Sequence, residues 1–233
     1  MRLLITRPEP DATRSAEVLR VLGHDVLVVP LLSTQTIEAN FEGPYGAVLM
    51  TSANAARALS SHPRACELTT LPAFTVGARS AEAARAAGFA DVTSADGALA
   101  DLVRLAAARS AGRSQRLLYL AGADRAGDLA GEIAVHGVAV DTAVIYRAVA
   151  AEQLPAKLAQ ALSNSGLDGA LHYSRRSVTI LIELAGSAGV LDALLSLVHY
   201  CLSAEVAAPL GNAGAHQISV APRPEEAALI DLL

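Results

Sequence analysis

The stretch RLLITRPEPDATRSAEVLRVLGHDVLVVP, residues 2–30, has the pattern of one strand–helix–strand unit. Residues 3–6 form a short apolar run, and residues 26–31 form a second one. Between them, apolar residues recur at helical spacing over positions 18–22 and stop at Gly23, a residue type that favours helix ends. Because both apolar runs are continuous and do not alternate with polar residues, they predict parallel strands that are buried on both faces.

The same pattern continues along the rest of the chain. Apolar runs that predict further strands lie at residues 47–50, 73–76, 117–120, 139–146, 170–173, 200–202 and 218–221. Alanine-rich segments with helical character separate most of these runs. Strands that alternate with helices in this way are typical of the α/β fold class.

An internal repeat accompanies the alternation. Three pairs of segments match in the same order, namely 2–23 with 116–137, 46–51 with 169–174, and 74–88 with 200–214. The simplest interpretation from the residues alone is two copies of one α/β unit, roughly 1–112 and 113–233. A chain of 233 residues suits two units of this size.

Composition excludes several classes of partner. The net charge of −5, the absence of Trp and the small number of aromatic residues argue against binding to nucleic acid. No apolar run approaches about 18 residues, and the N-terminus carries only a three-residue one, so we expect neither a membrane span nor a signal peptide. Cys66 and Cys201 stand alone, which predicts small buried residues in a reducing compartment. We therefore expect a cytoplasmic protein.

Polar residues gather where the predicted strands end. In parallel α/β sheets, ligands bind beyond the carboxyl ends of the strands, where helix N-termini offer free N–H groups. Each hydroxyl there is also a good helix cap by itself, so the indication comes from the whole set. The set predicts a rim that binds an anion. Its members are Arg7, Thr51, Ser52, Ser80, Arg125, Arg147, Ser174, Arg175 and Ser203.

Other common sites find little support in the sequence. No glycine pattern of a dinucleotide site or a P-loop occurs, and the six histidines lack metal-ligand spacing. We expect His172 and His199 in the core or at strand ends with their hydrogen bonds satisfied. We expect Glu225 and Glu226 as solvated charges in the first turn of the last helix. The chain is therefore expected to work without a metal or cofactor, through positioning and electrostatics.

The ordered set of short motifs resembles the uroporphyrinogen-III synthase family over essentially the whole chain. The motifs are LLITRP at 3–8, TSANA at 51–55, VGARSA at 76–81, LYLAG at 118–122, VIYR at 144–147 and YS at 173–174. The resemblance implies a cofactor-free, cyclising hydro-lyase. Such an enzyme converts hydroxymethylbilane to uroporphyrinogen III with loss of water and inversion of ring D, in haem, sirohaem and cobalamin biosynthesis.

The resemblance also implies an architecture. It consists of two similar flavodoxin-like lobes with parallel sheets, joined by a two-stranded β-ladder, with the active site in the cleft between them. Residues 1–33 and 149–233 would form one lobe, and residues 36–147 the other. The ladder would pair residues 33–37 with residues 144–148, so that the repeat is interleaved.

Several side chains acquire an implied role from the resemblance. Tyr146 matches the family tyrosine proposed to assist departure of the substrate hydroxyl as a hydrogen-bond donor, although an aromatic residue on a ladder strand also packs against its neighbours. Thr51, Ser52, Ser80 and Ser174 match hydroxyl positions that line the family's cleft. The family's Gly-x-x-Thr-Ala turn is absent, and Ser203 is left as the helix cap at the corresponding place.

Two other functions compete with the synthase. A non-catalytic, two-lobed anion-binding or regulatory module would share most of these features. A two-domain glycosyltransferase is less favoured, because it needs a longer chain and an acidic or histidine base. As partners we expect the small-molecule substrate and a transient contact with hydroxymethylbilane synthase, with the chain otherwise a monomer.

Overall fold

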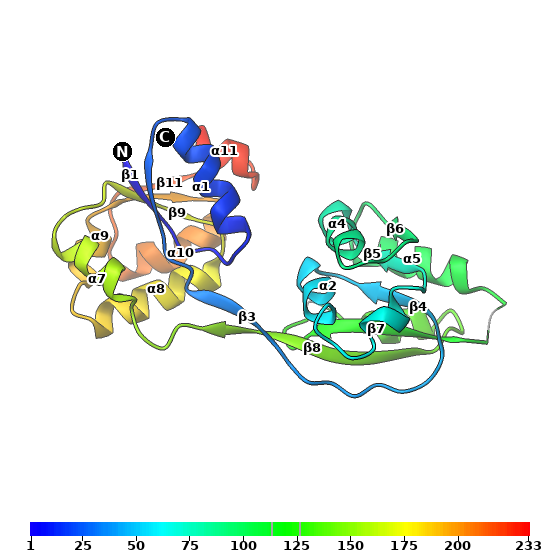
Figure 1. Ribbon diagram of the computed structural model, residues 1–233. Helices are drawn as coiled ribbons and strands as arrows, with labels where there is room; N and C mark the ends of the chain where they lie inside the picture. Colours follow the sequence, from blue (N-terminus) through cyan, green and yellow to red (C-terminus); the bar gives the residue numbers. More distant parts are fainter. Residues whose placement is uncertain (113, 126) are drawn as a thin grey trace. The chain divides into compact units, whose positions relative to one another are not determined.

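A computed structural model describes residues 1–112, 114–125 and 127–233 (Figure 1). It is a mixed α/β structure with two mostly parallel sheets, so the predicted fold class is confirmed. The chain divides into two compact units. The first unit contains Met1–Ser33 and Val149–Leu233, and the second contains Thr34–Ala148.

The first unit has a five-stranded parallel sheet in the order β11-β10-β9-β1-β2. The strands are β1 (Arg2–Ile5), β2 (Asp25–Val28), β9 (Gly169–His172), β10 (Val198–Cys201) and β11 (Ile218–Val220). Strand β1 lies between β2 and β9, and Leu3 is paired with Gly169. The simple tandem division near residue 112 is therefore wrong for the first two strands, which complete a sheet with the last third of the chain.

Helices cover both faces of this sheet. They are α1 (Asp11–Val21), α7 (Ala156–Ser163), α8 (Arg175–Ser187), α9 (Leu191–Leu195), α10 (Ala204–Ala213) and α11 (Glu226–Ile230). Leu4 packs in a cluster with residues of α7, α8 and α9, while Leu3 and Ile5 pack with residues of α1 and α11. All three leucine and isoleucine side chains are fully buried. Side chains of the continuous apolar run of β1 thus pack into the core on both faces of the sheet.

The second unit has a six-stranded sheet in the order β3-β8-β7-β4-β5-β6. The strands are β3 (Leu32–Thr36), β4 (Tyr45–Met50), β5 (Ala73–Thr75), β6 (Val92–Ser94), β7 (Arg116–Gly122) and β8 (Val140–Ala150). Strands β4 to β8 are parallel. The Ile37 N–H donates to the Ile145 carbonyl over 2.8 Å, and Ala151 N–H donates to the Leu31 carbonyl over 2.9 Å, so β3 runs antiparallel to β8.

The helices of the second unit are α2 (Ala53–Leu59), α3 (Ala65–Leu68), α4 (Ala78–Ala86), α5 (Leu99–Ser110) and α6 (Leu129–Ala134). Met50 packs in a cluster with residues of α2 and α4, whereas Leu49 and Tyr119 pack in a cluster with residues of α5 and α6. Neighbouring strand residues therefore face opposite helical layers, as the pleat of a strand requires.

The buried histidines and the cysteines test the remaining core predictions. His172 and His199 are buried on adjacent strands, with His172 Nε2 2.9 Å from His199 Nδ1, which confirms their place in the core. They are not fully satisfied, because His172 Nδ1 and His199 Nε2 are buried without a hydrogen-bond partner of ordinary geometry in the described ranges of the chain. Cys201 is buried as predicted, and its burial raises the pKa of its thiol to about 12. The prediction for Cys66 is wrong, because this residue lies exposed on the short helix α3. Among the residues that the structure describes, no helix is both long and apolar enough to cross a membrane.

Candidate functional site

The β4–α2 turn of the second unit brings two hydroxyl side chains to the carboxyl end of its sheet. Thr51 and Ser52 directly follow β4. Ser52 caps α2, because its hydroxyl accepts a hydrogen bond of 3.2 Å from the Asn54 N–H. Thr51 Oγ1 lies 3.0 Å from the hydroxyl of Tyr119, and the two groups share a hydrogen bond. One hydroxyl is thus used locally as a cap, and the other is held by a phenol.

Tyr146 on β8 lies over a glycine of the neighbouring strand. Gly122 is its partner in the sheet, and a Cβ atom at Gly122 would come within 2.7–2.9 Å of three atoms of the Tyr146 side chain. The Tyr146 carbonyl also accepts a hydrogen bond of 2.9 Å from the Ala123 N–H. The place of the phenol therefore depends on the absence of a side chain at Gly122.

The surroundings of Tyr146 keep its phenol protonated at neutral pH. Burial is the largest influence and raises the pKa of Tyr146 above its usual value. A hydrogen bond with Ser52 lowers this pKa, and the nearby Tyr119 raises it. A neutral phenol of this kind donates a hydrogen bond and is a weak acid.

Tyr119 is a site residue that the sequence analysis missed. Its side chain is almost fully buried in the α5/α6 layer, whereas Tyr146 packs against the α2/α4 layer. Two phenols from opposite faces of one sheet therefore hold the consecutive residues Thr51 and Ser52. The motif LYLAG at 118–122 contains Tyr119, but nothing in it indicates a partner on another strand.

The other predicted residues of the second unit are spread more widely. Ser80 is buried in the first turn of α4, so its hydroxyl does not reach the surface. Arg125 is exposed in the loop that follows β7. Arg147 is exposed on β8, and its Nε donates to Gln35 Oε1 on β3 over 2.9 Å. The structure brings Thr51 and Ser52 together with Tyr146. Ser80, Arg125 and Arg147 lie outside that group.

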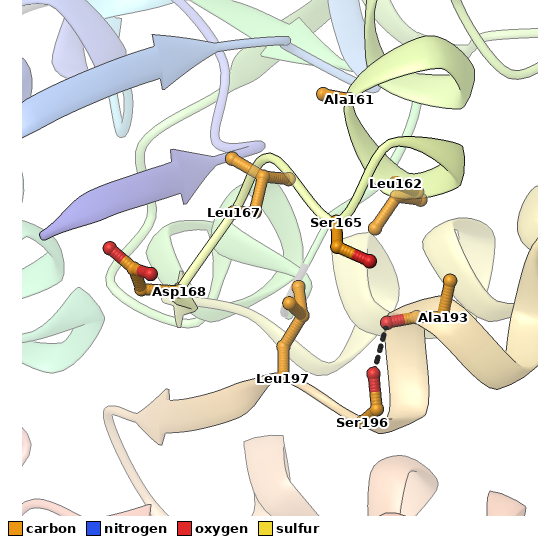
Figure 2. Close-up of a pocket in the computed structure, with 8 residues that line it drawn as sticks. All are labelled: Ala161, Leu162, Ser165, Leu167, Asp168, Ala193, Ser196 and Leu197. Atoms are coloured by element: carbon orange, nitrogen blue, oxygen red, sulfur yellow. Dashed lines mark hydrogen bonds between the residues drawn. The ribbon is translucent and has the colours of Figure 1, made fainter.

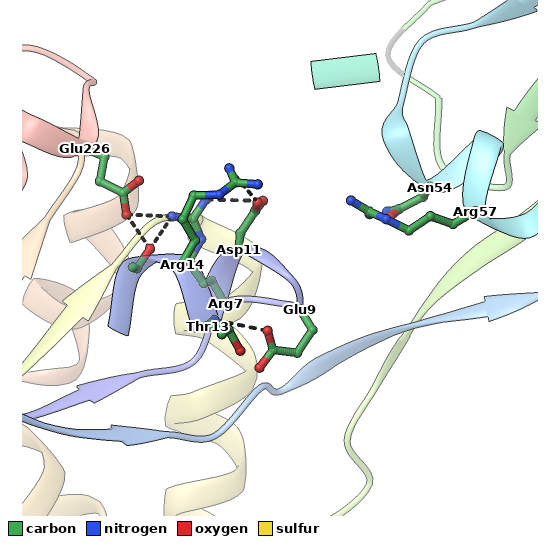
Figure 3. A network of polar contacts seen from close by, with 9 residues as sticks. Arg7, Glu9, Asp11, Thr13, Arg14, Asn54, Arg57 and Glu226 are labelled. Carbon is green, nitrogen blue, oxygen red and sulfur yellow. Dashed lines mark hydrogen bonds and ion pairs between the residues drawn. The ribbon is translucent and has the colours of Figure 1, made fainter. Parts of the chain in front are cut away.

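In the first unit, Arg7 lies two residues beyond β1 in a network of charged groups (Figure 3). Its Nη1 lies 2.9 Å from Glu226 Oε1 and 2.9 Å from the Ser15 hydroxyl. Its Nη2 lies 3.4 Å from Asp11 Oδ2. Glu226 lies in the first turn of α11 as predicted, but its carboxylate is not simply solvated, because Arg7 and Ser15 both bind it.

The ring of Tyr173 packs against the guanidinium group of Arg7. The Arg7 guanidinium carbon lies 4.0 Å from the centre of the Tyr173 ring, in the geometry of a cation–π contact. Burial is the largest influence on Tyr173 and raises the pKa of its phenol to about 12. The hydroxyl makes no hydrogen bond of ordinary geometry, although Ser15 and Glu226 lie close enough to affect its pKa.

The remaining predicted residues of the first unit stand at helix N-termini. Ser174 caps α8 by accepting a hydrogen bond of 3.1 Å from the Ser177 N–H, and Ser203 caps α10 by accepting one of 3.4 Å from the Val206 N–H. The interpretation of Ser203 as a helix cap is confirmed. Arg175 is exposed as the first residue of α8.

A small hollow of about 160 Å³ lies at the amino end of strand β9 in the first unit's sheet, opposite to the polar strand ends (Figure 2). It is lined by Ala161, Leu162, Ser165, Leu167, Asp168, Ala193, Ser196 and Leu197. Two of its polar side chains are engaged, since Asp168 accepts a hydrogen bond of 2.6 Å from the Arg2 N–H and Ser196 donates to the Ala193 carbonyl over 2.8 Å. The hollow precedes β9, so it is distinct from the polar strand ends described above.

The fold and these strand ends define a two-unit, mostly parallel α/β protein with hydroxyl groups, phenols and arginines beyond its strands. Within the described parts of the chain, no three His, Cys, Asp or Glu residues form a group that could hold a metal ion. The sequence model of the family described as uroporphyrinogen-III synthase HemD matches residues 13–231. The chain therefore belongs to the uroporphyrinogen-III synthase family, whose role lies in tetrapyrrole biosynthesis.

Solved structures support the same fold. The crystal structure of uroporphyrinogen-III synthetase from Helicobacter pylori is similar with a TM-score of 0.63 and 16% identity, covering 100% of this chain and 98% of that one. A mutant uroporphyrinogen III synthase from the extremely thermophilic bacterium Thermus thermophilus is similar with a TM-score of 0.50 and 17% identity, covering 100% and 97%. At these identities the likeness concerns the fold alone. Comparison with curated protein sequences finds no match.

Proposed function

We propose that this chain is a uroporphyrinogen-III synthase, a cyclising hydro-lyase that converts hydroxymethylbilane to uroporphyrinogen III. The observation that carries the proposal is the group of neutral hydroxyls at the end of the second unit's sheet, in which Tyr146 lies over Gly122 beside Ser52. Membership of the family and the shared fold support it.

The reaction begins with loss of the terminal hydroxyl of the substrate. The carbon–oxygen bond breaks as the lone pair of the adjacent pyrrole nitrogen forms an azafulvene. The hydroxyl leaves as water, and the pyrrole N–H gives up the proton that balances the one this water takes up. Tyr146 donates a hydrogen bond to the departing oxygen. Because the pKa of Tyr146 is raised, the phenol stays protonated and acts mainly by hydrogen bonding.

Ring closure depends on position rather than on a reactive side chain. The substituted carbon of ring D attacks the azafulvene, and the resulting spiro intermediate opens and closes again with ring D inverted. Without the enzyme, the chain closes to the isomer with ring D uninverted. The protein therefore has to hold the substrate so that one line of attack prevails, which is catalysis by proximity and orientation with charge stabilisation.

The substrate carries eight carboxylates, so binding requires donors and positive charge. In this proposal Thr51, Ser52 and Ser80 contribute from the second unit, and Ser174 and Ser203 contribute from the first through the helix N-termini that they cap. The guanidinium groups that would bind carboxylates are those of Arg7, Arg125, Arg147 and Arg175. The Ser80 hydroxyl is buried and the Ser80 N–H donates to the Gly77 carbonyl over 3.1 Å, so Ser80 would contribute through its place in the first turn of α4 and not as a direct donor.

The proposed setting is the cytoplasm, where both cysteines of the chain would remain free thiols. The protein would act as a monomer without a cofactor and receive its unstable substrate from hydroxymethylbilane synthase. Its product would serve haem, sirohaem or cobalamin synthesis.

The second candidate is an anion-binding or regulatory module without catalysis. It is favoured by one observation, namely that Arg7 already binds carboxylates of the chain itself. Such a module would bind a polycarboxylate and leave the ring closure uncatalysed.

A coupled assay separates the two candidates. Hydroxymethylbilane synthase generates the substrate in the presence of the full chain, and the oxidised type I and type III products are separated by chromatography. We expect mostly type III product, at a rate proportional to the amount of the chain. If type I alone forms at every protein concentration, the chain is not a synthase.

A further inference from the structure

In the proposed function Arg7 binds a carboxylate of the substrate. In the structure, Arg7 is already paired with Glu226 of the same chain. We infer that Arg7 is a carboxylate-exchange site, in which Glu226 holds the guanidinium until a carboxylate of an anionic ligand replaces it. The identity of that ligand as a tetrapyrrole polycarboxylate rests on the proposed function. The exchange itself rests on the geometry of the first unit.

Glu226 shows which chemistry the site accepts. Its Oε1 atom lies 2.9 Å from Arg7 Nη1, and the Ser15 hydroxyl donates to the same oxygen. Arg7 Nη1 also lies 2.9 Å from Ser15 Oγ, so the three groups form a closed triangle. A guanidinium and a hydroxyl that converge on one oxygen are suited to any carboxylate, whether it belongs to the chain or to a ligand.

Arg7 is held in place by contacts other than Glu226. Its guanidinium lies over the Tyr173 ring, and its second nitrogen is paired with Asp11 over 3.4 Å. The side chain of Arg7 is only 16% exposed. Departure of Glu226 would therefore leave the cation positioned, with one donor group open to a ligand.

Glu226 is free to leave without unfolding its helix. Its side chain is 37% exposed, and it is the first residue of α11. The buried residues Ala228 and Leu229 anchor that helix to the core. Rotation of the Glu226 side chain into solvent breaks its ion pair with Arg7 and its hydrogen bond from Ser15, and a ligand carboxylate in the same place would restore both contacts.

An internal carboxylate of this kind lowers the affinity for every ligand that uses Arg7. The apparent dissociation constant equals the intrinsic one divided by the fraction of molecules in which the site is open. Glu226 therefore favours ligands with several carboxylates, since other contacts of the same ligand must compensate for its displacement. In a synthase, this would disfavour metabolites that carry a single carboxylate.

The test measures binding of two probes to the full chain. The probes are uroporphyrin III, a fluorescent octacarboxylate, and mellitate, a hexacarboxylate that is not a tetrapyrrole. We expect Glu226→Gln to lower the dissociation constant of both probes about 5- to 20-fold. Glu226→Asp, whose shorter side chain draws back from Arg7, should lower it by a similar factor while the net charge stays the same.

Glu225→Gln is the matched control, because it removes the same charge from the neighbouring residue. Glu225 is exposed and pairs only loosely with Arg223, at 3.9 Å, so its variant should bind both probes within about twofold of the unmodified chain. Addition of Arg7→Gln to Glu226→Gln should remove the gain in affinity. Thermal melting of each variant shows that the first unit is still folded.

Three outcomes would overturn the exchange. They are equal affinities of the Glu226→Gln and Glu225→Gln variants, weaker binding after Glu226→Gln, and a lack of binding of either probe to any variant. Failure of the proposed function gives a different result, since a chain that forms no type III product would still bind mellitate more tightly after Glu226→Gln.

Discussion

The groups of polar side chains at the strand ends of the two units differ in charge. The edge of the second unit is built from neutral groups, with Thr51 held by Tyr119 and Ser52 by Tyr146. The edge of the first unit is built from charges, with Arg7 bound by Asp11 and Glu226. Neutral donors keep one protonation state over a wide pH range, which suits a group near a reacting bond. Charged groups attract anions more strongly, but they need counter-ions while no ligand is bound.

Acid should lower the stability of the first unit much more than that of the second, because the first unit buries a pair of histidines. Burial lowers the pKa of His172 to about 3 and that of His199 to about 4. Unfolded histidines take up protons below about pH 6.5, which the buried pair cannot do, so stability should fall as the pH drops below this value. We expect a loss on the order of 3 kcal/mol for each histidine by pH 4.

Urea unfolding at several pH values, with hydrogen exchange to follow each unit, measures this effect. The double variant His172→Gln/His199→Gln should lose most of the acid sensitivity, whereas His216→Gln, at an exposed position, should retain it. An unchanged stability of the first unit between pH 7 and pH 4 would mean that the pair does not control its response to acid.

Gly122→Ala should disrupt the neutral edge of the second unit. The added methyl group would come within 2.9 Å of the Tyr146 ring and push the phenol away from Ser52. We expect a loss of about 1–3 kcal/mol in stability, which is typical of overpacking. In the coupled assay, formation of type III product should fall at least as far as in a variant without the phenol. Gly186→Ala is the control, since that position is open, and a comparable loss there would remove the special role of Gly122.

Tyr146→Phe tests the phenol while it preserves the packing of the ring. We expect the rate of type III formation to fall roughly 10- to 100-fold, because one positioned donor is lost. The melting temperature should stay nearly unchanged, since the ring still lies over Gly122. Tyr45→Phe is the matched control, because its hydroxyl donates to the Glu42 carbonyl at the other end of β4. Full activity of Tyr146→Phe would exclude this phenol from the reaction.

Tyr119→Phe should have the smallest effect of the series. The variant loses one hydrogen bond between neutral groups, which costs about 1 kcal/mol in stability. Because the Thr51 hydroxyl is then free to turn, we expect a modest rise in the share of type I product. Thr51→Val should reproduce that rise, and the double variant should not exceed it. Additive effects of the two substitutions would show that the hydroxyls act independently.

Local patterns in the sequence were sufficient for the class of fold. Continuous apolar runs such as residues 3–6 predicted strands buried on both faces, and the structure confirms the parallel sheets. The short edge strand Val92–Ser94 was missed, because its three residues are only partly buried and show no apolar run. The pairing of β1 with β9 was not visible in local patterns either, since it joins residues more than 160 positions apart.

The types of residue in the candidate site could be predicted from the sequence. The side chains with which they form hydrogen bonds and ion pairs could be predicted less well. Hydroxyls after strands were found because strand ends are where α/β proteins present polar groups. The partners of Glu226 and Thr51 were missed, because Arg7 and Tyr119 are distant in sequence and meet them only in the folded sheet. Cys66 was misplaced for a similar reason, since a four-residue helix gives too little periodicity to show which side faces the core.

The placement of β1 and β2 beside β9 has a consequence for synthesis on the ribosome. Residues 1–33 leave the exit tunnel before residues 34–233, but β9, the next strand of their sheet, begins only at Gly169. Residues 34–148 emerge as a continuous piece in the meantime and contain the paired residues of the four parallel pairs β4–β5, β4–β7, β5–β6 and β7–β8. The nascent chain therefore carries an apolar, incomplete N-terminal segment while the inserted unit is already able to fold, and this interval is when a chaperone would bind it.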